Sequence, residues 1–338
     1  MSDIVSKTRE WRHVDAATFH TEIVPLAQPA VLKGLIAHWP AVKQGLSSHH
    51  ALANYLRALD HGEQIDTFNG DPQIRGRFFY QPDVQGVNFE RRKRSLTELI
   101  DDVLGQATVP EPRSVYAGSV TLPQVLPEFG SQNALTLLPA SVMPRIWIGN
   151  AITVPAHYDL SANIACVVGG RRRFTFFPPE QLVNLYVGPL DFTLAGQPVS
   201  MVDIEAPDLD RYPRFAEARE HAQYAELEPG DAVFVPHLWW HHVKSLDVFN
   251  VLVNYWWDDA KPWAGSPFEA LVHGLLAIRE LPEPQRRAWR LMFDHYVFRM
   301  GEDPAAHLPP QSLGVLGPLT SDLAGRIRLF LMHGLSNR

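Results

Sequence analysis

The sequence predicts a mainly β protein in which a strand-rich barrel carries flanking helices and a helical C-terminal segment. Short apolar runs of alternating pattern, separated by Gly and Pro turns, fill residues 113–258. Helical and extended patterns are mixed in residues 1–112, which we expect to pack on the barrel as an α/β segment. Helical periodicity takes over in residues 259–338.

Within the N-terminal segment the patterns predict two helices, His49–Leu59 and Ser95–Leu104. Extended runs predict strands at Ala30–Lys33 and Ile74–Tyr80. The basic run Arg91–Arg94 directly precedes the second helix, so we expect it on a solvated face at the start of that helix.

Composition limits the classes of protein to consider. The 338 residues are 46% hydrophobic and 20% charged, which is enough for one sizeable core. The net charge of −7 argues against a nucleic-acid partner, because phosphate binding relies on clustered Lys and Arg. Cys166 is the only cysteine, Met1–Lys7 has no apolar leader core, and no stretch is long enough to span a bilayer. We therefore expect a cytoplasmic protein without membrane contact.

A candidate metal site begins with the segment Val154–Asp159. In an extended strand residues i and i+2 point the same way, so His157 and Asp159 share a face. Such a triplet is weak evidence by itself, because a chain with 15 His produces it by chance and most such His lie on the surface or in a satisfied core.

The third ligand is expected from a second strand. The turn Pro229-Gly230 begins an apolar run, Asp231–Pro236, that delivers His241 or His242 a few residues later. Two His and one carboxylate, which leave three adjacent positions open, form the facial arrangement of non-haem Fe(II) oxygenases. Together the two segments indicate an iron site with room for a co-substrate and O2.

Between these segments the sequence predicts a β-hairpin with the two-residue turn Gly169-Gly170. That turn would place Val167 opposite Arg172, and the inward face would carry Asn163, Ala165, Val167, Arg172, Phe174 and Phe176. A buried guanidinium needs an anion, and a dicarboxylate co-substrate would supply one. The alternative, a solvated face, suits Arg171 and Arg173 better than Arg172.

The last strand of the predicted barrel is Phe249–Trp257. Its alternation puts Asn250, Leu252, Asn254 and Trp256 on one face, and two Asn within an apolar strand need hydrogen-bond partners. Four tryptophans flank the predicted metal segments, where their rings could shield the metal or line a substrate pocket: Trp239, Trp240, Trp256 and Trp257. Packing of the barrel explains most of them equally well, and Trp147 is expected in the core. A long insert rich in Pro and Asp, residues 185–226, is expected as a surface loop that could shape access to the site.

These motifs together resemble the JmjC/cupin-like (cupin_8) Fe(II)/2-oxoglutarate-dependent oxygenases. The likeness is greatest to the asparaginyl hydroxylase that inhibits hypoxia-inducible factor and to its bacterial cupin-like relatives. It rests on Val154–Asp159, Phe176–Pro179, Pro229–Asp231, Trp239–His242 and Val253–Trp256. The resemblance implies a double-stranded β-helix, also called a jelly roll.

The resemblance also implies roles for individual residues. Fe(II) ligands would be His157, Asp159 and His241, with His242 as a neighbour of the ligand set. The co-substrate 2-oxoglutarate would contact Tyr116, Asn163 and Asn254. The chain departs from the asparaginyl hydroxylase where Arg172 replaces Lys and Val154 replaces Thr, so Arg172 must bind the distal carboxylate in a different geometry.

Such a site implies an enzyme that uses O2 to hydroxylate a C–H bond of a protein side chain or small molecule, with release of succinate and CO2. The primary substrate could be a peptide, an amino acid or a small metabolite. Two alternatives remain at this point: a metal-binding cupin-like or helical interaction module without catalysis, and a metalloenzyme that does not use 2-oxoglutarate.

After the barrel the sequence predicts three helices. The first follows a capping box, Ser266–Glu269, and runs to Ile278. The second places Trp289, Met292, Phe293, Tyr296 and Val297 on one stripe, and the last begins near Thr320. Such stripes usually pack on their own domain, but the resemblance implies a homodimer through these helices.

Overall fold

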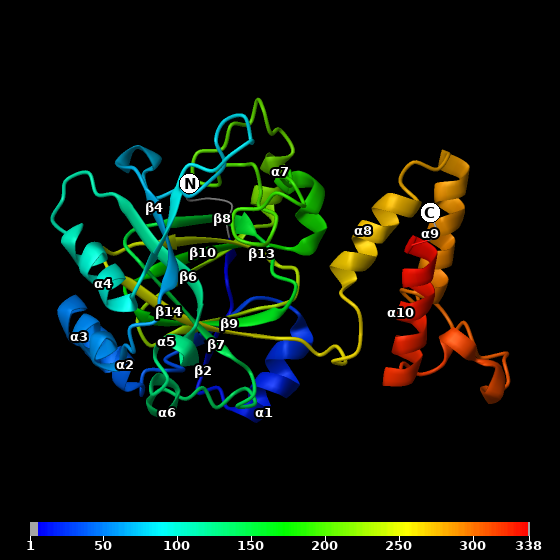
Figure 1. Cartoon of the computed structure of the whole chain (residues 1–338), viewed down its shortest axis with the longest axis horizontal. Coiled ribbons are helices and arrows are strands. Elements are labelled where there is room, and N and C mark those ends of the chain that lie inside the picture. Colours follow the sequence, from blue (N-terminus) through cyan, green and yellow to red (C-terminus); the bar gives the residue numbers. More distant parts are fainter. Residues whose placement is uncertain (1–5, 337–338) are drawn as a thin grey trace. The chain divides into compact units, whose positions relative to one another are not determined.

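The computed structural model describes residues 6–336, and the chain forms two compact units that divide between Asp258 and Asp259. Two sheets make up the centre of the first unit (Figure 1). The smaller sheet has the strand order β1 (Ser6–Lys7), β11 (Gln223–Leu227), β10 (Arg172–Phe177), β13 (Trp240–Ser245) and β8 (Thr153–His157). The larger has the order β2 (Glu10–Arg12), β3 (Ala30–Lys33), β12 (Ala232–Val235), β9 (Ala162–Gly169), β14 (Asn250–Trp257), β7 (Pro144–Gly149), β6 (Ser114–Thr121), β4 (Ile65–Gly70) and β5 (Glu90–Arg94).

The two sheets face each other across an apolar interior. Phe174 and Phe176 of the smaller sheet pack there against Ala165 and Val167 of the larger one. These inward residues alternate with outward ones along each strand, as expected for two sheets that bury one face against each other. The predicted double-stranded β-helix, mainly β with flanking helices, is therefore confirmed.

The opposite face of the larger sheet is covered by helices. α2 (Pro40–Ser47), α3 (His49–Leu59) and α4 (Leu96–Gly105) lie along one side of the strands, and the short helices α5 (Leu122–Val125) and α6 (Phe129–Gln132) complete the layer (Figure 1). The two helices predicted in this segment are confirmed. Their first residues are capped by side chains: the Ser48 hydroxyl accepts from the Ala51 amide (3.0 Å), and Ser95 with Glu98 forms a capping box.

A β-turn aspartate ties the larger sheet to the N-terminal segment. Asp231, just before β12, accepts hydrogen bonds from Lys33 Nζ (2.6 Å) and from the backbone amides of Gly34 (3.0 Å) and Glu228 (3.1 Å). Because the carboxylate is buried, these donors offset the cost of removing its charge from water.

The predicted hairpin of β9 and β10 is wrong. β9 pairs with β12 and β14 in the larger sheet, whereas β10 pairs with β11 and β13 in the smaller one. Gly169-Gly170 is thus a crossover between sheets, and Gly170 adopts a positive φ of 69°. The inward face was nevertheless predicted correctly, because strands of facing sheets also direct alternate residues into the shared interior.

Other expectations need correction in the same unit. Residues 74–80 form no strand; a 3₁₀ turn, Pro72–Ile74, and isolated bridges take their place. The basic run Arg91–Arg94 belongs to the edge strand β5 rather than to a helix, and exposed Arg and Lys suit an edge because they discourage further pairing.

The insert is more than a surface loop. After a 3₁₀ segment (Pro179–Leu185) its chain runs beside β8, where the Ser200 amide donates to Ala156 O (2.7 Å). It then forms α7 (Phe215–Glu220) and ends in β11, which pairs with β10. Apolar residues of the insert, among them Leu185, Val202 and Phe215, bury the outer face of the smaller sheet.

The second unit contains α8 (Pro267–Ala277), α9 (Glu283–Tyr296) and α10 (Ser321–Ser336), close to the predicted helices. The capping box predicted at Ser266 is wrong, since the Ser266 side chain makes no capping hydrogen bond. Most of the apolar stripe that was predicted to pack is exposed: Trp289, Met292, Tyr296 and Val297 are all on the surface.

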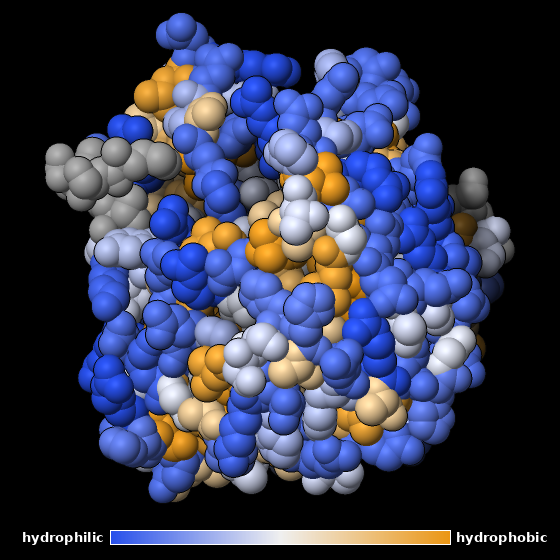
Figure 2. Space-filling view, turned by 90° about the vertical axis from the view of Figure 1, so that its left-hand side faces the viewer, coloured by the Kyte–Doolittle hydropathy of each residue, from blue (hydrophilic) through white to orange (hydrophobic). Residues whose placement is uncertain are grey.

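One face of the first unit is shown in Figure 2, where hydrophilic side chains cover most of the surface and hydrophobic ones form small patches between them. Among residues 6–336, no helix combines the length and the apolar character that crossing a bilayer requires. Cys166 lies fully buried in β9 as a free thiol, and burial raises its pKa.

Gly45 of α2 approaches the larger sheet too closely for any side chain. A Cβ there would lie 2.5 Å from the carbonyl oxygen of Val168 in β9. We therefore expect Gly45→Ala to lower the free energy of unfolding by about 1–3 kcal/mol, although Ala favours helices. The control is Gly105→Ala in α4, where nothing lies within 4 Å and helix propensity alone should act. Urea unfolding of both variants checks this, and equal effects would contradict it.

Candidate metal centre

Three side chains that could hold a metal ion converge inside the barrel. His157 ends β8, Asp159 follows two residues later, and His241 lies in β13 directly opposite His157 in the sheet register. One ligand atom from each lies within 4.8 Å of the others, and the two imidazole rings are 4.2 Å apart between centroids. Of the two histidines that the sequence left open, His241 is therefore the one in the cluster.

His242 points away from the cluster, because neighbouring residues of a strand face opposite sides. It is absent from the pocket lining, and the charges that act on its pKa are those of Glu205 and Asp203 in the insert and of Lys244 and Arg77. The expected place of His242 beside the ligand set is thus not what the structure shows; it is buried on the outer face of the sheet.

The backbone fixes the orientation of both imidazoles. His157 Nδ1 lies 2.9 Å from Pro155 O, and His241 Nδ1 lies 3.0 Å from Trp239 O. A carbonyl oxygen can only accept, so each Nδ1 carries the proton and each Nε2 keeps its lone pair for the cluster. The pKa of His241 is lowered to about 4, mainly by burial and to a smaller extent by His157. The charge of Asp159 acts in the opposite direction and raises this pKa. A neutral ring is the form that binds a metal.

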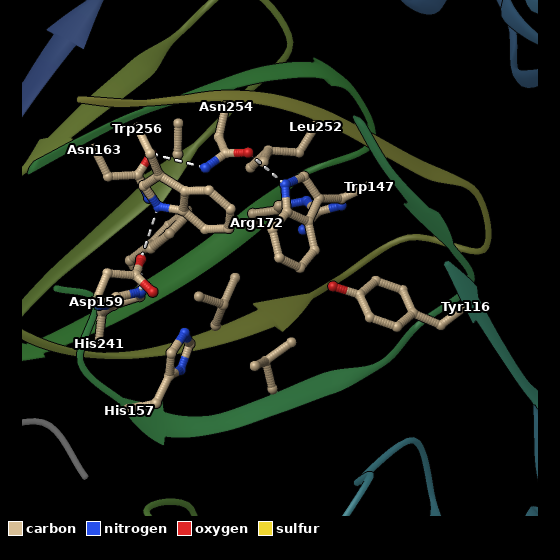
Figure 3. Close-up of a pocket in the computed structure, with 14 residues that line it drawn as sticks. Tyr116, Trp147, His157, Asp159, Asn163, Arg172, His241, Leu252, Asn254 and Trp256 are labelled. Carbon is tan, nitrogen blue, oxygen red and sulfur yellow. Dashed lines mark hydrogen bonds and ion pairs between the residues drawn. The ribbon is translucent and has the colours of Figure 1, made fainter. Parts of the chain in front are cut away.

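Asp159 is held by an indole. Trp256 Nε1 donates to Asp159 Oδ2 at 3.0 Å, and the same oxygen lies 3.5 Å from His241 Nε2 (Figure 3). Trp256 is the only one of the four tryptophans predicted near the metal that lines the pocket. Trp239 packs between the sheets, Trp240 under the insert, and Trp257 against the rings of Phe19 and Phe234.

Arg172 lies in the same pocket without an anionic partner. Only 2% of this residue is exposed, and its guanidinium forms no hydrogen bond or ion pair with any residue of the described range 6–336. Burial lowers the pKa of Arg172 to about 10, so the group remains charged at neutral pH. The two arginines next to it in the sequence are paired on the surface, Arg171 with Asp247 and Arg173 with Glu226. The predicted inward arginine is confirmed.

A hydrogen-bonded row of amides and an indole forms another wall. Asn254 Nδ2 donates to Asn163 Oδ1 (3.1 Å), and Trp147 Nε1 donates to Asn254 Oδ1 (2.6 Å) (Figure 3). The partners expected for Asn254 are thereby identified. Trp147 was expected in the core, but the register of β7 places it opposite Leu252 on the pocket face. The only sequence signal for this position was the alternation that puts Arg145 and Trp147 on one face of their strand. Which strand pairs with β7 cannot be deduced from the sequence.

The remaining wall is aromatic and aliphatic. The Tyr116 hydroxyl points into the pocket (Figure 3), and burial raises the pKa of this phenol, which keeps it a neutral donor. Val154, Phe174, Val243 and Leu252 line the rest. All of the residues predicted for the site therefore lie around one cavity: His157, Asp159, His241, Tyr116, Asn163, Arg172 and Asn254.

Comparison with curated proteins gives partial matches. HSPB1-associated protein 1 of Homo sapiens is 34% identical over 148 residues, which cover 43% of this chain and 30% of that protein. The tRNA wybutosine-synthesizing protein 5 of Danio rerio is 39% identical over 101 residues, 30% of this chain and 28% of that protein. A longer match, 27% identity over 272 residues, covers 71% of this chain and 80% of the bifunctional peptidase and (3S)-lysyl hydroxylase JMJD7 of Homo sapiens.

The match with HSPB1-associated protein 1 thus spans less than a third of that relative's own length. The family comparison covers far more of the chain, since the model of the cupin-like domain matches residues 16–261. This range contains both sheets apart from β1 and β2, together with all the residues of the cluster. The chain accordingly belongs to the cupin-like family of JmjC-domain proteins.

Proposed function

We propose that the protein is an Fe(II)- and 2-oxoglutarate-dependent oxygenase that hydroxylates a C–H bond of a protein side chain or small molecule, with release of succinate and CO2. The observation that supports this most is the unpaired Arg172 guanidinium in the same cavity as the cluster of His157, Asp159 and His241. A charge buried without a partner is very costly, so an anion that completes the site accounts for it.

The ligand atoms fit ferrous iron. Two neutral imidazole nitrogens and one carboxylate oxygen are the donor set of non-haem iron oxygenases, and they leave adjacent positions open. The hydrogen bonds from Nδ1 of each histidine and from Trp256 to Asp159 are the outer contacts that commonly orient metal ligands. When bound, Fe(II) would supply the activation of O2 that couples oxidation of the keto acid to hydroxylation.

The other polar residues suit 2-oxoglutarate. Arg172 would bind its distal carboxylate with two parallel hydrogen bonds, as a planar guanidinium does best. The Tyr116 hydroxyl would donate to the same carboxylate, and Asn163 and Asn254, locked together by their own hydrogen bond, would orient the rest of the molecule. The apolar wall of Val154, Phe174 and Leu252 would keep water from the reacting atoms.

The alternatives are less well supported. A metalloenzyme that does not use 2-oxoglutarate would be favoured by a solvent-facing Arg172, and this residue is buried. A binding module without catalysis has no need of a charged group held unpaired beside metal ligands. We also propose a cytoplasmic location, since the single cysteine is a free buried thiol.

The first test is anaerobic titration of the protein with Fe(II) and 2-oxoglutarate. Chelation of the keto acid to Fe(II) should produce a visible metal-to-ligand charge-transfer band, and His157→Ala should abolish it by removing one of the three ligands. His242→Ala, on the outer face of the same sheet, is the control and should keep the band. Metal binding without a band in the wild type would favour the metalloenzyme that does not use 2-oxoglutarate.

Arg172→Met tests the anchor separately from the metal. It should weaken 2-oxoglutarate binding by about tenfold to a hundredfold, because a charge-assisted pair contributes about 1.5–3 kcal/mol. It should also raise the free energy of unfolding of the ligand-free protein by removing an uncompensated buried charge. Arg173→Met, which removes an exposed guanidinium from the same strand, should change neither quantity. Calorimetric titration and urea unfolding check both, and equal effects of the two variants would contradict the assignment.

We further propose a homodimer formed through the helices of the second unit. Large apolar side chains are exposed on all three of them, including Leu276 in α8, Leu291 in α9 and Phe330 in α10. Large apolar side chains left exposed in such number suit an association surface. Neither nucleic acid nor a membrane is expected as a partner.

Phe330, 78% exposed, is the residue with which to test this dimer. Phe330→Glu should convert a dimer into a monomer in sedimentation-velocity runs, because a carboxylate cannot be buried there without a partner. Leu46→Glu, at an apolar position of α2 in the first unit that is 63% exposed, should leave the dimer intact. A wild-type monomer at micromolar concentration would refute the proposal.

A further inference from the structure

A second arginine lies on the same face of the larger sheet as the pocket-lining Asn254. Arg145 of β7 lies directly opposite Asn254 of β14, and residues paired in this way project from the same face of a sheet. Two residues further along β7, Trp147 lines the pocket. The side chain of Arg145 therefore lies on the pocket side of the larger sheet, whereas Arg172 comes from the smaller sheet on the other side of the cavity.

The guanidinium of Arg145 is held against the indole that contacts the metal cluster. Its Cζ lies 5.6 Å from the ring centroid of Trp256, and Trp256 in turn donates to Asp159. Nη1 donates to the backbone oxygen of Ser119 (3.0 Å) and to its hydroxyl (3.3 Å). One aromatic ring thus separates this cation from the carboxylate of the metal site.

Ser119 is placed there by an irregularity in β6. The register of β6 against β7 shifts between Ala117 and Val120. Ser119 has a φ of 56°, a backbone conformation that is energetically unfavourable for any residue other than glycine. The preceding Gly118 has no room for a Cβ, which would lie 2.8 Å from the ring of Trp147. The bulge therefore turns the two oxygens of Ser119 toward Arg145 and fixes the guanidinium.

These contacts leave Arg145 without an acidic partner. Within residues 6–336 no carboxylate lies within ion-pair distance of it, and its only hydrogen bonds come from Nη1. The Nε and Nη2 donors remain for a ligand. A half-buried, oriented guanidinium with unused donors is the usual means of binding a carboxylate or phosphate.

We infer that Arg145 determines substrate specificity by binding an oxyanion, carboxylate or phosphate, of the primary substrate beside Trp256. This rests on the proposed function, in which Arg172 is occupied by the co-substrate. The substrate would therefore be an anion. The carbon atoms of the substrate next to its anionic group would lie toward Asp159. The two arginines would thus bind different anions: Arg172, inside the cavity, binds the co-substrate, and Arg145, beside the cavity-lining Trp256, binds the substrate.

The test uses the full-length protein loaded with Zn(II) and 2-oxoglutarate, so that Arg172 is already filled. Three capped amino acids serve as probes in ligand-observed NMR titrations: N-acetyl-aspartate amide, N-acetyl-O-phosphoserine amide and the neutral N-acetyl-asparagine amide. One of the two anionic probes should bind at least about tenfold more tightly than the neutral probe. Which of the two binds more tightly distinguishes a carboxylate from a phosphate.

Two variants localise that preference. Arg145→Gln should abolish it. Arg91→Gln should keep it, because Arg91 is a matched control that also lies over a ring (Phe68, 5.4 Å) and donates to a backbone oxygen (Leu194, 2.9 Å). Should Arg145→Gln not fold, Arg145→Lys keeps the charge without the planar fork and should reduce the preference severalfold.

No charge preference in the wild type, or an unchanged preference in Arg145→Gln or Arg145→Lys, would overturn the inference. The same samples report whether Zn(II) and 2-oxoglutarate bind at all. A charge preference that depends on Arg145 together with absent 2-oxoglutarate binding would refute the oxygenase proposal but keep the anion site. Binding of 2-oxoglutarate without a charge preference that depends on Arg145 would leave the oxygenase proposal intact and remove Arg145 from substrate recognition.

Discussion

The pairing of β13 with β8 is the constraint on which the site depends. It places His241 opposite His157, and the two residues that follow His157 bring Asp159 to the same point. Each imidazole is then oriented by the backbone carbonyl of the residue two positions earlier in the sequence. A slip of one residue in this register would replace His241 by His242, which faces the insert. The geometry of the candidate metal centre therefore depends on the register of the sheet as well as on the identity of the three ligands.

The two sheets contribute different parts of the proposed chemistry. The smaller sheet supplies the two histidines and Arg172, while the larger sheet supplies Asn163, Asn254 and the indoles of Trp147 and Trp256. Because the interior between them is otherwise apolar, each polar group there is either hydrogen-bonded or left for a ligand. The hydrogen-bonded groups are those of Asn163, Asn254 and both tryptophans. The group left for a ligand is the guanidinium of Arg172.

Several expectations failed for one common reason. The glycine pair after β9 has the local chemistry of a hairpin turn, yet it connects two sheets, and the insert contributes a strand and part of the outer core. Trp147 was predicted in the core for the same reason, since its place on the pocket face follows from pairing with a strand about a hundred residues away. Local pattern distinguishes strands from turns, but the partner of a strand depends on contacts distant in the sequence.

The sequence by itself determined the alternation that turns His157, Asp159, Arg172 and Asn254 to one side of their strands, because side-chain direction in a strand has a period of two. It also predicted the fold class and two helices of the first unit, α3 and α4. Only the tertiary structure decided between His241 and His242, showed that Arg172 has no anionic partner in the described chain, and placed Arg145 against Trp256. Those facts depend on which strands meet and in which register, and that is settled by packing of the whole barrel.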